Sequence, residues 1–371
     1  MDNTALKEKL SEALALLAIP GIGCGRFQRL VDAFGSPRAV LETPIARLTE
    51  VKGITRKQAT SIRELQDYEK AGRMAAEIVH LGWTALFQGD AEYPESLAQI
   101  PNAPALLFRV GQAYQKSNSM LAVVGTRHPT EQGRMLARQL AAQLAQRGIV
   151  VVSGMAEGID SEAHLGALEA GGRTVAVWGT SLDIIFPSSN RSLAAQIREN
   201  GAIYSEYPPG TRPDRATFPQ RNRIISGLCE GVVVVEAGSK SGALITAEQA
   251  RDQGREVFAV PGSPSSAMSE GANQLIRQGA RLITGIDDIF DELPRLRGQV
   301  SARKFETLMH LTESESRVTD LLSKGPVHVD NLVRDIGLPA PGLMELLLAL
   351  ELKGVVRELA GKRFVLVDEG R

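Results

Sequence analysis

The sequence predicts an α/β protein. Its parallel-sheet core is expected between an all-helical N-terminal domain and a small C-terminal domain of helices and one hairpin. From about residue 84, apolar runs rich in β-branched residues each end in a glycine or a small polar residue. Amphipathic helical patterns separate these runs. Apolar strands that alternate with helices are typical of a parallel sheet covered on both faces.

The core strands are expected at five of these runs, with helices over 131–146 and 241–252 between them. The five runs are Leu121–Gly125, Ile149–Gly154, Thr174–Gly179, Val232–Glu236 and Val257–Gly262. Two further strands are expected at Ala105–Val110 and Arg281–Thr284. The sheet should therefore be larger than a minimal nucleotide-binding unit.

Changes in hydrophobic period and in composition divide the chain into four parts. Residues 1–80 predict helices only, and residues 81–292 form the expected α/β core. The stretch 293–305 contains proline and several arginines and is predicted to be a linker. Residues 306–371 predict a separate compact domain.

The pattern of the last domain indicates a winged helix. Thr312 and Glu315 have the spacing of a capping box at a helix start. Further helices are expected after Asp330 and from about Pro341, followed by a hairpin that turns at Gly361. The last of these helices carries leucines and two glutamates, whereas a helix that reads DNA presents Arg, Lys, Asn or Gln. We therefore expect this domain to contact protein or to pack on the core.

Composition limits the possible partners. The chain has 371 residues and a formal net charge of -1, so a site for a polyanion has to be a local patch. Its two cysteines, Cys24 and Cys229, lie far apart without metal-ligand spacing, which suits a reducing cytosol and predicts no metal site. The N-terminus lacks a signal-peptide pattern, and no apolar run approaches the roughly 18 residues of a membrane span. We expect a cytoplasmic protein without a membrane partner.

The segment Phe218–Gly227 is unusually basic for such a chain. It contains Arg221, Asn222 and Arg223, and Arg212 and Arg215 lie just upstream. The planar donor fork of arginine matches the geometry of phosphate. A solvated helix start with structural ion pairs is the alternative interpretation.

Small residues follow the predicted strands at the sheet edge where ligands of open parallel sheets bind. Backbone amides, hydroxyls and cations at these positions are suited to phosphate. The positions are Gly125, Thr126, Arg127, Ser153, Gly154, Gly158, Lys240, Ser241 and Gly242. None matches a dinucleotide fingerprint or a phosphate loop, and a tight strand-to-helix turn needs glycine in any case. Asp160 is expected to cap a helix and His164 to be structural, since neither can be paired with a nucleophile.

Together these segments resemble the DprA/Smf family of DNA-processing proteins, in order over about residues 120–285. The segments that carry the resemblance are Val123–Arg127, Ser153–Asp160, Ser205–Gly210, Phe218–Gly227, Val235–Ala237, Ser241–Ala247, Gly254–Gly262 and Asn273–Ile276. The resemblance implies an extended Rossmann-like core that binds single-stranded DNA and forms a homodimer. It also implies loading of the recombinase RecA onto incoming single strands during natural transformation, without catalysis or a cofactor.

The resemblance further implies roles for particular residues. Phosphates would be bound by Gly125–Arg127, by Arg221–Arg223 and by Ser241–Gly242. Phe186 and Phe218 are candidates for base stacking. The chain departs from the family at Glu157, where arginine is frequent, and at Gln132 and Phe186, where tyrosines are frequent.

Two other functions and two interpretations of the N-terminal domain stay open. Related Rossmann-like enzymes hydrolyse nucleotide N-glycosidic bonds, but their Pro-Gly-Gly-x-Gly-Thr-x-x-Glu loop is absent near Glu236–Ser241. A winged-helix regulator is the other alternative. The turns Ile19–Gly23 and Val51–Thr55 resemble helix-hairpin-helix units, which hold nucleic-acid backbones, or belong to a purely structural SAM-type bundle.

Overall fold

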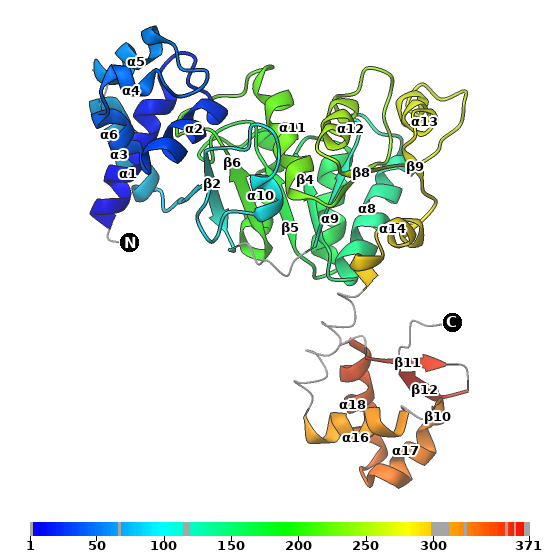
Figure 1. Cartoon of the computed structure of the whole chain (residues 1–371). Helices are drawn as coiled ribbons and strands as arrows, with labels where there is room; N and C mark the ends of the chain where they lie inside the picture. The colour runs from blue at the N-terminus through cyan, green and yellow to red at the C-terminus, as the bar shows by residue number, and fades with distance from the viewer. Residues whose placement is uncertain are drawn as a thin grey trace. The chain divides into compact units, whose positions relative to one another are not determined.

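The computed structural model describes residues 3–65, 68–113, 119–297, 312–322, 325–352, 355–359 and 361–366. Residue contacts divide the chain between Leu293 and Pro294 into two compact units, and Figure 1 labels most of their elements. The predicted linker over 293–305 lies largely outside the described residues. Its described part contains a short 3-10 helix, η2 (Pro294–Leu296), in which Leu296 is buried.

The core of the first unit is one sheet of nine described strands in the order β1-β2-β6-β5-β4-β3-β7-β8-β9. The strands are β1 (Thr84–Phe87), β2 (Leu106–Gly111), β3 (Met120–Val124), β4 (Val150–Ser153), β5 (Thr174–Val177), β6 (Ala202–Ser205), β7 (Gly231–Val234), β8 (Glu256–Ala259) and β9 (Arg281–Leu282). The seven strands from β3 to β9 are parallel, whereas β2 pairs antiparallel with both β6 and β1. The sheet is therefore mixed.

The seven predicted strands are all present, as β2, β3, β4, β5, β7, β8 and β9. The expectation of a wholly parallel sheet is wrong at the edge formed by β1 and β2, and β1 and β6 are strands that the sequence analysis did not identify. A buried strand has the same apolar pattern in either direction, so its direction depends on the neighbour with which it pairs.

Helices cover both faces of the sheet. On one face, the cluster around Val175 and Val177 of β5 includes Ile224 of α11 and Ala243 of α12. On the other, Ala176 packs with α10 and α9, and α9 in turn packs against α8 (Figure 1). The core helices are α7 (Glu95–Ala98), α8 (Glu131–Gln146), α9 (Ile159–Glu169), η1 (Ser188–Asn190), α10 (Arg191–Asn200), α11 (Thr217–Leu228), α12 (Gly242–Asp252), α13 (Glu270–Arg277) and α14 (Ile286–Glu292).

The N-terminal helices pack on the β1–β2 edge of the sheet. They are α1 (Asn3–Leu17), α2 (Cys24–Phe34), α3 (Pro37–Glu42), α4 (Ile45–Leu48), α5 (Arg56–Arg63) and α6 (Tyr68–His80). Their buried side chains form one apolar cluster with Trp83, Phe87 and Phe108 of the core. Lys9 of α1 also forms an ion pair with Asp90 at 3.4 Å and lies 3.8 Å from the ring centroid of Phe87. The helical domain and the core therefore share one hydrophobic interior.

The second unit has the predicted winged-helix order. It contains α16 (Glu313–Leu322), β10 (Val327–His328), α17 (Val329–Ile336), α18 (Ala340–Leu352), β11 (Val356–Leu359) and β12 (Arg363–Leu366). The capping box is confirmed, because Thr312 N donates to Glu315 Oε2 at 2.9 Å and Glu315 N donates to Thr312 Oγ1 at 3.3 Å. Gly337 ends α17 with a φ of 77°, as a left-handed C-cap.

Among the described helices, none has the length and apolar composition of a membrane span.

In the core, the contact between α8 and α9 depends on a glycine. A Cβ at Gly166 of α9 would overlap the carbonyl oxygen of Arg138 on α8. Two carboxylates of α9, Glu162 and Glu169, also bind the guanidinium of Arg138.

We predict opposite effects on stability for two helix-interior glycines. Gly166→Ala should lower the free energy of unfolding by about 1–3 kcal/mol, because a carbonyl oxygen occupies the space of the new methyl group. Gly72→Ala in α6 should raise it by about 0.5–1 kcal/mol, because the nearest neighbour of the new methyl group would be Ser11 Oγ, at 4.0 Å. Urea unfolding of both variants checks this, and equal effects would contradict it.

Candidate nucleic-acid interface

Four loops meet at the carboxyl edge of the parallel strands, after β3, β4, β5 and β7. The strand order reverses at β3, which lies between β4 and β7. Open α/β sheets bind ligands at such a switch point. The loops after β3 and β7 are joined by a hydrogen bond of 2.7 Å from Thr126 N to Glu236 O, and Ile159 N donates to Thr126 O at 3.2 Å. The structure thus brings the predicted loops together.

Two of the predicted glycines serve this loop packing. A Cβ at Gly125 would lie 2.6 Å from Ile159 Cγ1 and 2.8 Å from Glu236 O. Gly158 has a φ of +81°, and a Cβ there would lie 2.5 Å from Thr126 O. Both positions are closed by neighbouring protein atoms, so we interpret these glycines as requirements of the loop contacts rather than as an open anion cradle.

The amides of the loop after β4 already bind an anionic group of the protein itself. Asp160 Oδ2 accepts hydrogen bonds from Gly154 N at 3.1 Å and from Ala156 N at 3.3 Å. Asp160 thus caps the loop that precedes α9, whereas a cap of the helix was expected. Ser153 is fully buried, and its hydroxyl donates to Val123 O at 2.7 Å. In this arrangement Ser153 and Gly154 support the edge from within.

Arg221 lies beneath the same loops, although the sequence suggested an exposed phosphate ligand. Its side chain is 4% exposed, and Nη1 donates to the carbonyl oxygens of Gly154 and Val177. Burial lowers the pKa of Arg221 to about 10, although the nearby Asp160 carboxylate acts in the opposite direction. Burial in turn raises the pKa of Asp160, which the charge of Arg221 counteracts. The two charges compensate one another in the protein interior.

Arg223 is also engaged within the protein. Its Nη2 lies 2.5 Å from Glu206 Oε2, and the two side chains are 17% and 11% exposed. Burial raises the pKa of Glu206, and the charge of Arg223 lowers it. Asn222, the uncharged residue between these two arginines, donates from Nδ2 to Gly242 O at 3.4 Å. This bond links α11 to the start of α12.

His164 is structural, as expected. It is fully buried, and its Nδ1 lies 2.6 Å from Thr174 Oγ1. The Thr174 hydroxyl donates to Val151 O, so the imidazole Nδ1–H is the donor of this bond. Burial and, to a lesser extent, Arg221 lower the pKa of His164 from 6.5 to about 3. The imidazole is therefore neutral at physiological pH.

An aromatic and cationic surface remains exposed above this buried network. The ring centroids of Phe186 and Phe218 lie 5.6 Å apart, and Phe186 is 42% exposed. The exposed Arg127 lies over Phe218, with its guanidinium 5.6 Å from the ring centroid. A Cβ at Gly179 would lie 2.8 Å from Phe218 Cδ1, so glycine lets this ring settle against the loop after β5.

The start of α12 forms the other accessible part of the edge. Ser241 caps the helix by accepting a hydrogen bond from Ala243 N at 3.3 Å. Gly242 is exposed, with open space where a Cβ would be, and Lys240 beside it is exposed as well. Here, unlike at Gly125, an anion could approach the helix N-terminus.

Two exposed arginines were noted in the sequence but not assigned to the site. Arg212 and Arg215 lie on the loop between β6 and α11. This loop is attached to the one after β5, because Ser181 N donates to Thr211 O at 3.1 Å and the Asp183 carboxylate accepts from Gly210 N. Their charge was visible in the sequence, but their place at the edge follows from these loop contacts.

The exposed side of α18 in the winged helix presents no cation. Met344 is 46% exposed and Leu348 is 57% exposed, and Glu345 and Glu351 are exposed beside them. This surface does not have the side chains that read bases or bind phosphates. Among the described residues, no group of three or more His, Cys, Asp or Glu side chains is placed to hold a metal ion.

We predict a pH effect on stability from His164. The unfolded chain takes up a proton on this residue at about pH 6.5, whereas the folded imidazole does so only at about pH 3. The free energy of unfolding should therefore fall by about 1.4 kcal/mol per pH unit through this window as the pH is lowered. Asp160, whose pKa is raised, acts in the opposite direction.

Urea unfolding at several pH values, compared with His164→Asn, isolates this contribution. The variant should show a shallower loss of stability on acidification, and the matched change at the exposed His80, His80→Asn, should leave the loss as it is. Identical pH profiles for His164→Asn and the unmodified protein would contradict the assignment.

Comparisons with known proteins agree with this architecture. Family models match as follows: "DNA recombination-mediator protein A" over residues 84–294, "DprA winged helix domain" over 305–362 and "SAM-like Helix-hairpin-helix tandem" over 13–64. Protein Smf of Escherichia coli is 34% identical over 91% of this chain and 93% of its own, and DNA processing protein DprA of Bacillus subtilis is 43% identical over 62% and 77%.

Two solved structures are also similar. The X-ray structure of DprA from Streptococcus pneumoniae superposes with a TM-score of 0.67 at 33% identity, covering 76% of this chain and 97% of that one. A Helicobacter pylori DprA structure, described for its single-stranded DNA binding mode, superposes with a TM-score of 0.52 at 30% identity, covering 57% and 96%. The chain belongs to the DprA/Smf family of DNA-processing proteins.

Proposed function

We propose that this protein is a non-catalytic mediator of recombination. In this proposal it binds and protects incoming single-stranded DNA and loads RecA onto it during natural transformation. Family membership supports a role in DNA processing, and the Helicobacter pylori relative is described as a single-stranded DNA binder. The observation that carries the proposal is that Arg127, Phe186 and Lys240 are all exposed on loops at the carboxyl edge of the parallel strands.

The chemistry of this surface suits a single strand. Arg127 and Lys240 offer charge to phosphates, and the open start of α12 at Gly242 offers backbone amides. The exposed ring of Phe186 offers a face for stacking a base, which any base can use. Arg221 and Arg223 contribute indirectly, since they hold the loops and α11 in place through buried bonds.

The burial of the ionisable groups favours binding over catalysis. Asp160 and His164 lie in the interior and are occupied by hydrogen bonds, and Glu206 is paired with Arg223. A nucleotide N-glycosidic hydrolase needs a carboxylate that reaches its substrate. The exposed carboxylates of Glu157, Asp183 and Asp214 on these loops accept hydrogen bonds from Ser189 Oγ, Gly210 N and Ala216 N. The exposed cations, amides and aromatic ring at this edge are the groups suited to binding DNA.

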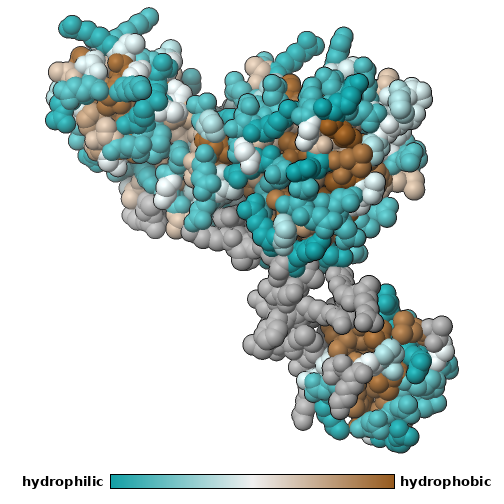
Figure 2. Space-filling model, turned by 45° about the vertical axis from the view of Figure 1, so that its right-hand side comes forward, coloured by the Kyte–Doolittle hydropathy of each residue, from teal (hydrophilic) through white to brown (hydrophobic). Residues whose placement is uncertain are grey.

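The homodimer and the contact with RecA are part of the proposal. The edge strand β9 exposes both of its residues, and Leu282 is 49% exposed. Ile245 of α12 is 38% exposed, and a groove of about 430 Å³ runs between α12 and α13. Figure 2, in which this end of the core is turned toward the viewer, shows an apolar area on the surface. An open strand edge with apolar neighbours suits association with another protein chain.

Loss of two edge cations should weaken binding to single strands. The double variant Arg127→Ala with Lys240→Ala should bind labelled oligo-dT at least tenfold more weakly at low salt. The slope of log affinity against log salt should fall by about 0.7 for each lost phosphate contact. Fluorescence anisotropy over a salt series measures both quantities.

Arg198→Ala is a control for loss of a surface charge, because Arg198 is an exposed cation at the end of α10, where the chain enters β6 from the opposite sheet edge. Unchanged oligo-dT affinity of the double variant would contradict this assignment. The same variant should lose stimulation of RecA strand exchange on single strands; full stimulation without DNA binding would contradict the loading role.

The aromatic surface predicts a separate effect that salt does not screen. Phe186→Leu keeps an apolar side chain but removes the ring, so affinity for oligo-dT should fall by about 1–3 kcal/mol with no change in salt slope. Titration at two salt concentrations separates this effect from loss of charge. An unchanged affinity would mean that no base stacks at Phe186.

A further inference from the structure

The two hairpin turns of the N-terminal domain are joined into one rigid piece. Arg26 donates from Nη1 to Gly21 O at 2.7 Å and from Nε to Gly53 O at 2.8 Å. Gln58 Nε2 also donates to Gly21 O, at 3.0 Å. Both glycines have left-handed φ values, of 84° and 88°. The side chains carried by the two turns therefore have a fixed arrangement.

Unpaired cations surround these turns. Lys52 precedes Gly53, Arg56 and Lys57 begin α5, and all three are exposed. None of them has an ion-pair partner within the described part of the chain. Arg29 extends the group from α2, because its Nη2 lies 3.2 Å from the position of a Cβ on Gly53. We call Arg29, Lys52, Arg56 and Lys57 the hairpin cations.

Two of these cations lie where they reduce the stability of their helix. Arg56 and Lys57 occupy the first turn of α5, which contains no acidic residue. A cation near the positive end of the helix dipole costs about 0.3–1 kcal/mol. The helix start is stabilised instead by Thr55 and Gln58, which form a capping box. Folding thus does not explain the choice of cations at these positions.

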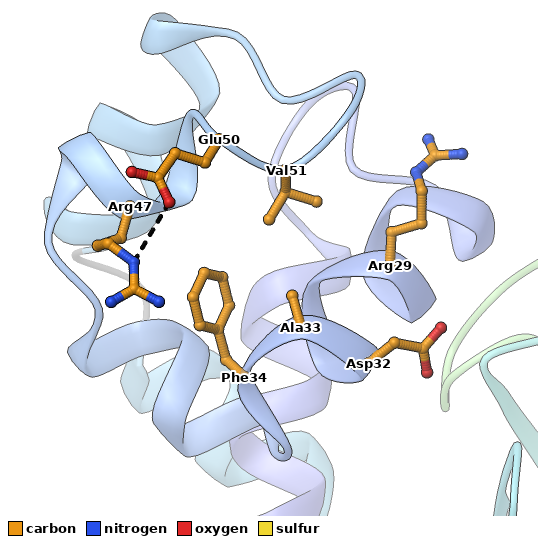
Figure 3. Close-up of a pocket in the computed structure, with 7 residues that line it drawn as sticks. All are labelled: Arg29, Asp32, Ala33, Phe34, Arg47, Glu50 and Val51. Carbon is orange, nitrogen blue, oxygen red and sulfur yellow. Dashed lines mark ion pairs between the residues drawn. The ribbon is translucent and has the colours of Figure 1, made fainter.

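The neighbouring hollow does not explain them either. It has a volume of about 470 Å³, and Phe34 and Val51 point toward one another across it (Figure 3). It is lined by two cations, Arg29 and Arg47, and two carboxylates, of which Arg47 and Glu50 pair at 3.3 Å. Arg29 borders both the hollow and the turns, whereas Lys52, Arg56 and Lys57 lie on the turns outside the hollow and carry the excess of positive charge.

The first turn leads to the carboxyl edge of the core. Helix α2 begins at Cys24, directly after this turn. A Cβ on the next residue, Gly25, would lie 3.3 Å from Asn102 Oδ1, so the start of α2 lies against the core loop that precedes β2. The beginning of β2 lies beside the end of β6, because Phe108 pairs with Ser205, and Tyr207 follows β6 directly. Tyr207 donates from its hydroxyl to Thr217 O at the start of α11. The hairpins and the proposed DNA-binding edge are therefore neighbours.

We propose that the hairpin cations form a second contact for the phosphate backbone of DNA, beyond the segment held at the core edge. This rests on the proposed function, because the strand reaches the hairpins from that edge. The contact is electrostatic and independent of sequence, since it uses cations on a rigid frame and no group that reads bases.

The test compares two lengths of oligo-dT. The variant carries Lys52→Ala, Arg56→Ala and Lys57→Ala in the full chain. An oligomer of roughly 6 nucleotides fills the core edge alone, and one of roughly 25 nucleotides also reaches the hairpins. We expect unchanged affinity for the short oligomer and about tenfold weaker binding of the long one. The salt slope for the long oligomer should fall by about two units.

A matched control removes three cations that have carboxylate partners, through Arg38→Ala, Arg47→Ala and Arg73→Ala. It changes net charge equally and should bind both oligomers as the unmodified protein does. The test variant should keep or raise its melting temperature, because it relieves the helix dipole of α5.

The outcomes separate the two proposals. If the unmodified protein binds neither oligomer, the proposed function fails. If it binds the long oligomer more tightly and the test variant retains this gain, the second contact does not exist and the core function stands. The second contact would also be overturned if the test variant lost affinity equally for both oligomers, or if the control variant lost as much affinity for the long oligomer as the test variant.

Discussion

The buried guanidinium of Arg221 is the interaction on which the carboxyl edge of this sheet depends. It binds the carbonyl oxygens of Gly154 and Val177, at the ends of two neighbouring strands, and lies beside the buried Asp160. Asp160 in turn accepts hydrogen bonds from the backbone amides of the loop after β4. Because each buried charge needs the other, removal of either would leave an uncompensated charge in the interior. The network fixes α11 and two loops against one another.

This network divides the polar residues of the edge into two groups. Arg221, Arg223, Asp160 and Glu206 are used within the protein, whereas Arg127, Lys240 and Phe186 remain available to a ligand. A DNA-binding surface needs both groups, since exposed cations and a ring bind well only when their positions are held. Residues that lie side by side in one basic segment can therefore have different physical roles.

Much of the fold could be predicted because buried strands and helices carry apolar residues in characteristic runs and periods along the chain. The apolar runs located seven of the nine described strands of the core sheet, and the capping box and turn glycines located the winged helix. The direction of β2 could not be predicted, because it depends on pairing with β6. The burial of Arg221 could not be predicted either, because it depends on loops from other parts of the chain that cover the side chain.

By itself, the sequence determined which loops carry glycine, hydroxyl and cationic groups, and that these loops follow parallel strands. It also determined the acidic and apolar character of α18 and the family to which the chain is related. Only the tertiary structure decided which of those groups face outward, closing Gly125 and Gly158 under neighbouring loops and leaving Gly242 open. The reason is that exposure and charge pairing depend on contacts between separate segments of the chain, such as the ion pair of Glu206 with Arg223. A local sequence pattern does not contain this information.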